Sequence, residues 1–428
     1  RGVRKESVPG GSVSPGKTLP YGPSARPEQA RREPGRETRG PGADFGDACA
    51  MPTRLSDRAR WTAALTLAAL TLSGCSSGGN PANVNPVPSN LDARRAAFPL
   101  SDADLGKLGY RRDWVGYPTV MTGQSIAHVA VYPDIIAVQD TASTVSVMEA
   151  GSGERRWANE IATKLTRFVG FTRIDSQLAV SADSDLYVLN LNDGSISSRQ
   201  SYSRLVNTSP VLVGDLAVYG TASGEVIAHS ISLGFTRWAY GTRSAINQPG
   251  VLVNGTFGAV TQVGEVVFIN PTTGILQGRS KQMFAGTGVR PIAAGDLMVV
   301  ASSDQSLYAF RTDGSLAWRY RTSAPLTRQP VFHDGVIYAE VEGRLAAFNT
   351  RGELVWKSAE VSGEVVAVRK GRLMVFNGTT FSQVDAARGE TIASADFSFV
   401  ERFIPETFAD GNLYVVGKSG VIAKLMPR

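Results

Sequence analysis

Residues 311–320, with the sequence RTDGSLAWRY, contain the pattern that decides the fold. Asp313 and Gly314 are typical of a tight hairpin, because glycine adopts a positive φ at no steric cost. After the turn, alternation by two predicts that Leu316 and Trp318 share one face of a strand and that the neighbouring residues lie on the other face. A large ring at this position is expected to pack between adjacent sheets. The stretch therefore predicts the turn and last strand of an antiparallel unit.

The same turn returns about every 40 residues along the chain. The turn glycines, 37 to 41 residues apart, are Gly153, Gly194, Gly234, Gly274, Gly314, Gly352 and Gly389. Tryptophan follows four of them after four residues, at Trp157, Trp238, Trp318 and Trp356. Residues 335–341 (GVIYAEV) alternate by two, whereas helical solenoids show apolar residues every three or four positions. Eight such units between residues 132 and 428 predict an all-β fold, an eight-bladed β-propeller of four-stranded antiparallel blades.

The eighth unit, residues 405–428, lacks a glycine turn and an outer strand. At the other end of the repeats, an isolated strand contains Trp114, which precedes Trp157 by 43 residues. We therefore predict that residues 108–118 pair with residues 412–426 and close the ring, which removes an exposed strand edge.

The residues before the repeats have the order of an export signal. Residues 1–50 are rich in Arg, Gly, Pro and Glu without an apolar period, which predicts either disorder or an untranslated upstream segment, and we favour a start at Met51. Residues 51–74 join three arginines to an apolar stretch that is too short to span a membrane, as in a signal peptide.

This signal ends in LSGC at Cys75, which resembles the lipobox of bacterial lipoproteins. In such proteins the cysteine thiol receives a diacylglycerol and becomes the mature N-terminus. Ser76 follows where aspartate would favour the inner membrane, so the resemblance implies an outer-membrane, periplasm-facing lipoprotein. Residues 75–107 are then expected to be the lipidated N-terminus and a flexible tether, and residues 108–428 the propeller.

Composition narrows the classes of function. Residues 1–74 hold 12 Lys+Arg and 7 Asp+Glu, so residues 75–428 hold 32 and 31, and this near-neutral body predicts no nucleic-acid patch. Cys49 and Cys75 both precede the repeats, so the repeats contain no disulfide. The three histidines, scattered unlike zinc ligands, are His128, His229 and His333. We expect no metal site and no catalytic residue.

The spacing from turn glycine to tryptophan resembles the tryptophan-docking repeat of pyrroloquinoline-quinone propellers, from Trp114 to the end of the chain. Two branches share this repeat: quinoprotein dehydrogenases and the BamB-like lipoproteins of the outer-membrane β-barrel assembly machinery. A lipobox, a tether and eight blades resemble the second branch, which implies a non-catalytic scaffold without a cofactor. The sequence departs from the pattern at Ser198, Gly278 and Ala393, which replace tryptophan, and at Phe235, which replaces a small turn residue.

The resemblance implies that a rim loop leading into the fourth blade contacts the partner, a BamA-like β-barrel assembly protein or an unfolded barrel precursor. Here that loop is residues 241–248, and Arg243 and Ile246 are the candidate partner-binding residues. A propeller rim suits docking of an extended segment or a partner domain.

Two other functions remain open. A quinoprotein dehydrogenase would need an acidic cluster for calcium and a catalytic aspartate, and turn chemistry already accounts for Asp140, Asp183, Asp304 and Glu342. An exported propeller that binds a ligand or carbohydrate could instead use its central channel. The aromatic residues in longer inter-blade segments are Phe168, Phe171, Phe399 and Phe403.

Overall fold

The structure, a computed structural model, describes residue 96 and residues 98–428. The expected signal peptide, Cys75 and most of the expected tether therefore lie outside the described residues. The elements with defined bounds are one helix, α2 (Asp102–Lys107), and the strands β1 to β32. Within the described residues, no helix is long and apolar enough to cross a membrane.

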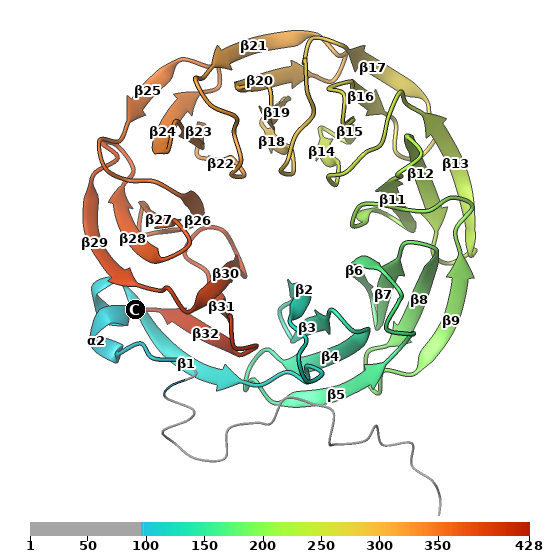
Figure 1. Cartoon of the computed structure of the whole chain (residues 1–428), viewed down its shortest axis with the longest axis horizontal. Helices are drawn as coiled ribbons and strands as arrows, with labels where there is room; N and C mark the ends of the chain where they lie inside the picture. Colours follow the sequence, from blue (N-terminus) through green and yellow to red (C-terminus); the bar gives the residue numbers. More distant parts are fainter. Residues whose placement is uncertain (1–95, 97) are drawn as a thin grey trace, which may run out of the picture. The chain divides into compact units, whose positions relative to one another are not determined.

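Eight four-stranded antiparallel sheets stand around a central axis as the blades of a propeller, which confirms the predicted fold (Figure 1). Blades 1 to 7 follow chain order, with the first strand innermost. Blades 1 to 4 are β2 (Ile126–Val131), β3 (Ile135–Asp140), β4 (Thr144–Glu149), β5 (Arg155–Glu160); β6 (Phe168–Ile174), β7 (Gln177–Ala182), β8 (Asp185–Asn190), β9 (Ile196–Ser201); β10 (Val211–Val213), β11 (Leu216–Gly220), β12 (Glu225–Ser230), β13 (Phe235–Gly241); and β14 (Val251–Val253), β15 (Thr256–Val260), β16 (Val266–Ile269), β17 (Leu276–Ser280). Blades 5 to 7 are β18 (Ile292–Ala294), β19 (Leu297–Ser302), β20 (Ser306–Arg311), β21 (Leu316–Arg321); β22 (Val331–His333), β23 (Val336–Val341), β24 (Arg344–Asn349), β25 (Leu354–Lys357); and β26 (Glu364–Arg369), β27 (Arg372–Phe376), β28 (Thr380–Asp385), β29 (Thr391–Asp396).

Blade 8 closes the ring with strands from both ends of the repeats, as predicted. It consists of β30 (Val400–Pro405), β31 (Leu413–Gly417), β32 (Ile422–Pro427) and, outermost, β1 (Tyr110–Gly116). The register of β1 and β32 runs from the pair Tyr110 and Pro427 to the pair Gly116 and Ile422.

The segment before β1 also packs against the propeller. Helix α2 begins after Ser101, whose hydroxyl accepts a hydrogen bond from the Asp104 N–H. Phe98 and Leu105 are buried together with side chains of blades 7 and 8. Sequence analysis assigned residues 98–107 to the tether, whereas the structure packs the segment on the propeller, because its apolar residues Phe98, Leu100 and Leu105 are buried in the core at the closure point.

The hydrophobic core is divided into eight wedges, one between each pair of neighbouring blades. In the wedge between blades 1 and 2, for example, Val147 of β4 and Leu178 of β7 are fully buried. Middle strands are therefore apolar on both faces, and β3 is buried along its whole length. Each blade is stabilised by its two neighbours rather than by a common centre.

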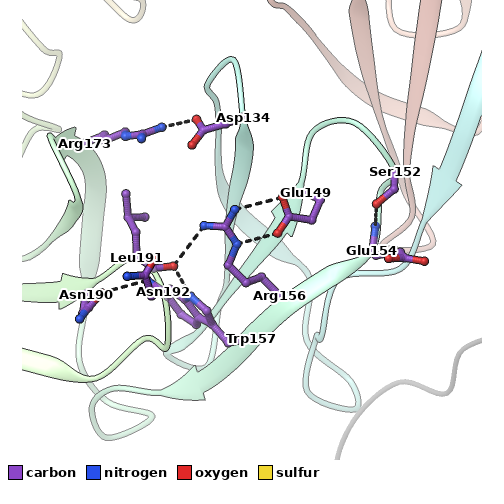
Figure 2. A network of polar contacts seen from close by, with 10 residues as sticks. All are labelled: Asp134, Glu149, Ser152, Glu154, Arg156, Trp157, Arg173, Asn190, Leu191 and Asn192. Atoms are coloured by element: carbon purple, nitrogen blue, oxygen red, sulfur yellow. Dashed lines mark hydrogen bonds and ion pairs between the residues drawn. The ribbon is translucent and has the colours of Figure 1, made fainter.

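Tryptophans of the outer strands join successive blades. Trp157 of β5 donates its Nε1–H to the carbonyl oxygen of Leu191 in blade 2 at 2.8 Å (Figure 2). Its ring covers Gly194, where an added Cβ would lie 2.5 Å from the Trp157 Cε3 atom. Each tryptophan thus packs on the turn glycine of the next blade, about 35 residues later in the chain, and not on the glycine four residues before it. The equivalent hydrogen bonds run from Trp114 to Ala150, Trp238 to Pro271, Trp318 to Thr350 and Trp356 to Ala386.

Two of the junctions without tryptophan use other contacts. Between blades 2 and 3, the amide of Gln200 donates to the Ile231 carbonyl at 2.8 Å, the role that the indole N–H has elsewhere. Between blades 4 and 5, Gly278 lies directly against the Asp313 backbone, so close that an added Cβ would be 2.3 Å from the Asp313 carbonyl carbon.

One expectation about the repeat is wrong. Leu316 packs in the wedge between blades 4 and 5, whereas Trp318 packs in the wedge between blades 5 and 6, so the two do not share a face. The pairing of β20 with β21 skips Ala317. This one-residue bulge inverts the alternation and turns the tryptophan toward the next blade.

The meander order gives the propeller two different faces. The turns between the first and second and between the third and fourth strands of each blade lie on one side, which we call the turn face. The turns between the second and third strands and the loops between blades lie on the other side, which we call the loop face. The tryptophan-docking turns belong to the turn face.

Candidate partner-binding face

Carboxylates in the turns of the loop face hold the inter-blade loops in place. Glu265 accepts a hydrogen bond from the Arg243 N–H at 2.9 Å. Asp304 accepts one from the Phe284 N–H at 2.9 Å, and Glu342 accepts one from the Ser323 N–H at 3.0 Å. These three loops, between blades 3 and 4, 4 and 5, and 5 and 6, are thereby fixed to the next blade, since a charged acceptor strengthens a hydrogen bond to the backbone.

The electrostatic environment keeps the Glu342 carboxylate charged. The Lys357 ammonium, followed by Ser323, lowers the pKa of Glu342 to about 2. Glu265 is almost fully buried, and the Arg279 guanidinium lies 2.8 Å from its Oε1 atom. Asp304 and Glu342 therefore have structural contacts, as turn chemistry predicted, and Asp140 likewise accepts backbone hydrogen bonds from Met121, Ala142 and Thr144.

Four large apolar side chains project from the loop face of blades 1 to 5. Their exposed fractions are 97% for Leu165, 60% for Leu205, 55% for Val263 and 79% for Phe284. Leu165, Leu205 and Phe284 lie in loops between blades, and Val263 lies in the turn between β15 and β16. We call these four residues the apolar loop row. Large apolar side chains exposed on one face of a propeller are candidates for an interaction surface.

Basic side chains accompany the row. Arg204, next to Leu205, has its Nε 3.1 Å from a carboxylate oxygen of Glu225. Arg243 is 60% exposed and lies 3.9 Å from Glu265. The Arg243 loop is tied to the turn of Val263, whose N–H donates to the Ser244 hydroxyl. The loop face therefore offers apolar side chains flanked by oriented guanidinium groups, a combination enriched in binding hot spots.

The structure separates the two predicted partner-binding residues. Arg243 lies exposed on the loop face, whereas the Ile246 side chain is fully buried. Ile246 fills the space above Gly220, where an added Cβ would lie 2.4 Å from the Ile246 Cγ2 atom. Ile246 cannot contact a partner from this position, so its prediction as a binding residue is corrected: it belongs to the core between blades 3 and 4.

The other candidates are distributed over separate blades. His128, His229 and His333 lie on β2, β12 and β22, and the described residues contain no cluster of three metal-ligand side chains. Phe168 and Phe171 pack between blades 1 and 2, whereas Phe399 and Phe403 pack between blades 7 and 8. These four aromatic residues therefore do not line a common pocket.

Sequence analysis missed the apolar loop row. Leu165 and Leu205 each follow a basic residue in a polar inter-blade loop, where no strand pattern requires an apolar side chain. Ile246 is likewise an aliphatic residue in a polar inter-blade loop, so only the fold shows which of these side chains remain exposed.

The blades, the tryptophan-docked turns and the exposed loop face define a quinoprotein-type β-propeller with a surface suited to binding. The family described as outer membrane protein assembly factor BamB matches residues 100–240 and 262–393, which together are more than half of the chain. The protein belongs to this family. No curated protein matches the chain significantly in sequence.

Solved structures share the propeller at low sequence identity. The BamB structure from Moraxella catarrhalis has 16% identity and a TM-score of 0.57, covering 73% of this chain and 98% of that chain. The computationally designed protein Ika8 has 15% identity and a TM-score of 0.60, covering 73% of this chain and all of its own. The quinohemoprotein alcohol dehydrogenase from Comamonas testosteroni has 13% identity and a TM-score of 0.58, covering 77% and 79%. These similarities establish the fold alone.

Proposed function

We propose that the protein is an outer-membrane lipoprotein, anchored through Cys75, that acts as a non-catalytic scaffold in the assembly of outer-membrane β-barrel proteins. In this proposal the loop face binds a BamA-like assembly protein. Membership of the BamB family supports the setting, and the apolar loop row is the observation that carries the binding site. Arg243 lies exposed beside the site. Ile246 anchors the same loop through its burial in the core between blades 3 and 4.

The energetics of the row suit a stable contact. Burying one exposed leucine or phenylalanine side chain contributes about 1.5–3 kcal/mol. Three or four such anchors offset the cost of association when arginines orient the partner. Because the body of the chain is close to neutral, we expect the affinity to change little with salt.

The test is a calorimetric titration of the purified protein with the periplasmic region of the assembly protein. The double variant Leu205→Ser/Phe284→Ser should bind at least about tenfold more weakly, since two exposed anchors are lost. The matched control is Leu354→Ser/Ile392→Ser, which alters exposed apolar residues of β25 and β29 and should bind like the parent. Equal affinity of the loop-face variant and the control would contradict the proposed site.

The same pair of variants tests the other proposed partner. If the loop face binds unfolded barrel precursors and not the assembly protein, Leu205→Ser/Phe284→Ser should lower the affinity for these precursors and leave the titration with the assembly protein unchanged. Oxidation of alcohols or sugars by the protein after addition of pyrroloquinoline quinone and calcium would favour the dehydrogenase function and would contradict the scaffold.

The lipid anchor has a separate test. Cys75→Ser removes the thiol that would be acylated, so the folded protein should appear in the soluble periplasmic fraction instead of the membrane fraction. A stable anchor requires more than one acyl chain, and the variant has none. Firm retention of this variant in membranes after a high-salt wash would show that another contact holds the protein.

A further inference from the structure

The turns between the third and fourth strands differ in charge from blade to blade. In five blades a carboxylate residue stands directly before or after the turn glycine. These residues are Glu154, Asp193, Asp313, Glu353 and Glu390. In blades 3 and 4 it carries none, and the sequences are ISLGFT at 231–236 and NPTTGILQ at 270–277. The two uncharged turns are adjacent on the turn face.

Large apolar side chains stand at the tips of these two turns. The exposed fractions are 56% for Leu233, 50% for Phe235, 65% for Ile275 and 36% for Leu276. We call these four residues the apolar turn patch. The turn of blade 4 rests on the outer strand of blade 3, because Trp238 of β13 donates its Nε1–H to the Pro271 carbonyl at 3.0 Å. The two turns that carry the patch therefore belong to neighbouring blades that this contact holds together.

The charges around the patch favour an anionic partner. The Arg237 guanidinium lies 5.7 Å from the centre of the Phe235 ring, and Arg237 is exposed and forms no ion pair among the described residues. The nearby carboxylate, Asp215, accepts hydrogen bonds from the Ser230 hydroxyl and from the N–H and hydroxyl of Ser232. The patch thus presents a cation without an ion-pair partner beside apolar side chains, while the carboxylates near it, Asp215 and Asp313, already accept hydrogen bonds from serine donors.

We propose that the apolar turn patch inserts into the interface of an anionic lipid bilayer. Leucine, isoleucine and phenylalanine on protruding turns can enter the boundary between headgroups and acyl chains, and a basic residue beside them attracts anionic headgroups. A protein partner would instead have to supply a matching hollow for two projecting turns. The proposal does not depend on the lipid at Cys75. Because the patch lies on the turn face, a bilayer there leaves the loop face free.

The experiment is vesicle flotation of the full chain with the Cys75→Ser substitution, so that no acyl chain contributes. The vesicles contain phosphatidylethanolamine and phosphatidylglycerol. The parent should float with the vesicles, and Leu233→Ser/Phe235→Ser/Ile275→Ser should lower the partition coefficient at least about tenfold. Arg237→Gln should weaken binding to these vesicles and leave binding to phosphatidylcholine vesicles unchanged.

The matched control is Leu354→Ser/Val355→Ser/Ile392→Ser, which removes a similar exposed apolar area from blades 6 and 7 beside charged turns. It should float like the parent. Equal partition of the patch variant and this control overturns the proposal, as does a parent that does not float. Concentration-dependent dimerisation that the patch variant abolishes, without flotation of the parent, would assign the patch to protein contact and also overturn it.

A second measurement does not depend on the folding of a triple variant. An environment-sensitive fluorophore attached to Ile275→Cys, in a chain with Cys49→Ser and Cys75→Ser, should shift to shorter wavelength when vesicles are added. The same fluorophore at Leu354→Cys should not shift. The titration with the assembly protein separates this proposal from the proposed function, because the patch variant should keep the parent's affinity and Leu205→Ser/Phe284→Ser should keep its flotation.

Discussion

At the scale of single residues, the fold depends on a contact between one indole ring and one glycine of the next blade. Trp318 and Gly352 form such a pair: the indole N–H is bonded to the Thr350 carbonyl and the ring leaves no room for a side chain on Gly352. Two features require glycine at position 352. Its φ of +81° is unfavourable for other residues, and the indole ring of Trp318 leaves no room for a Cβ atom. Glycine at this position thus connects a local turn to the long-range order of the ring.

Gly352→Ala and Gly335→Ala separate these two requirements. Both glycines have positive φ, but an added Cβ meets Trp318 at 2.4 Å in the first case and nothing within 4 Å in the second. We expect Gly335→Ala to lower the free energy of unfolding by about 1–2 kcal/mol, and Gly352→Ala to lower it by about 1–3 kcal/mol more through overpacking. Denaturant unfolding measures both, and equal losses would show that the ring can move aside.

A second prediction at this scale concerns His229, at the junction where Gln200 replaces tryptophan. His229 is fully buried, with Nε2 2.9 Å from the Gln200 Oε1 atom, and burial lowers its pKa from 6.5 to about 4. The unfolded chain therefore binds a proton at a higher pH than the folded protein does. Stability should fall as the pH decreases from about 6.5 toward 4.

His229→Gln should reduce this loss of stability, measured as the change in melting temperature between pH 7 and pH 5. His333→Gln is the control and should keep the parent's dependence on pH. A His229→Gln protein with the same dependence as the parent would mean that other groups cause the acid sensitivity.

At the scale of elements, the sequence predicts the turns and strands well because they depend on local chemistry. The glycine period and the isolated strand at Trp114 lead to eight blades and to the closure of β1 on β32. The bulge at Ala317 could not be predicted, because alternation by two cannot show that one residue is skipped in pairing. The sequence also could not predict which loop residues are buried. Ile246 and Leu205 are both aliphatic residues in polar loops, but Ile246 occupies the space that a side chain on Gly220 would fill and is therefore buried in the core.

The closure makes a prediction about the two ends of the repeats. A chain that begins at residue 118 lacks β1 and leaves the β32 edge without a partner, so it should melt at lower temperature and associate. Deletion of residues 76–95 is the control, since it leaves every described contact in place. A chain without β1 that stays monomeric with the parent's melting temperature would refute a stabilising role of closure.

Substitution of the docking tryptophans tests the junctions between neighbouring blades directly. Trp157 is buried, so Trp157→Ala should cost about 3–5 kcal/mol of unfolding free energy. Trp114 is only half-buried, so Trp114→Ala should cost less. Calorimetric or denaturant unfolding of the two variants shows which one loses more unfolding free energy. A larger loss for Trp114→Ala would indicate that the closing blade is the weakest part of the ring.

At the scale of the whole molecule, the wedge-shaped cores allow the two faces to differ without affecting the fold. Each wedge needs only its neighbouring blades, so loops and turns can carry exposed apolar residues at little structural cost. The loop face holds Leu205 and Phe284, and the turn face holds Phe235 and Ile275, on opposite sides of the ring. A bilayer on one side and an assembly partner on the other would use both.

The most direct test of the scaffold is photo-crosslinking in intact envelopes, with a photoreactive amino acid at position 205 or 284 and, as the control, at position 354. The account predicts that both loop-face positions crosslink to the β-barrel assembly protein and that position 354 does not. Crosslinking of that protein from position 354 alone, or from none of the three positions in envelopes that hold both proteins, would contradict it.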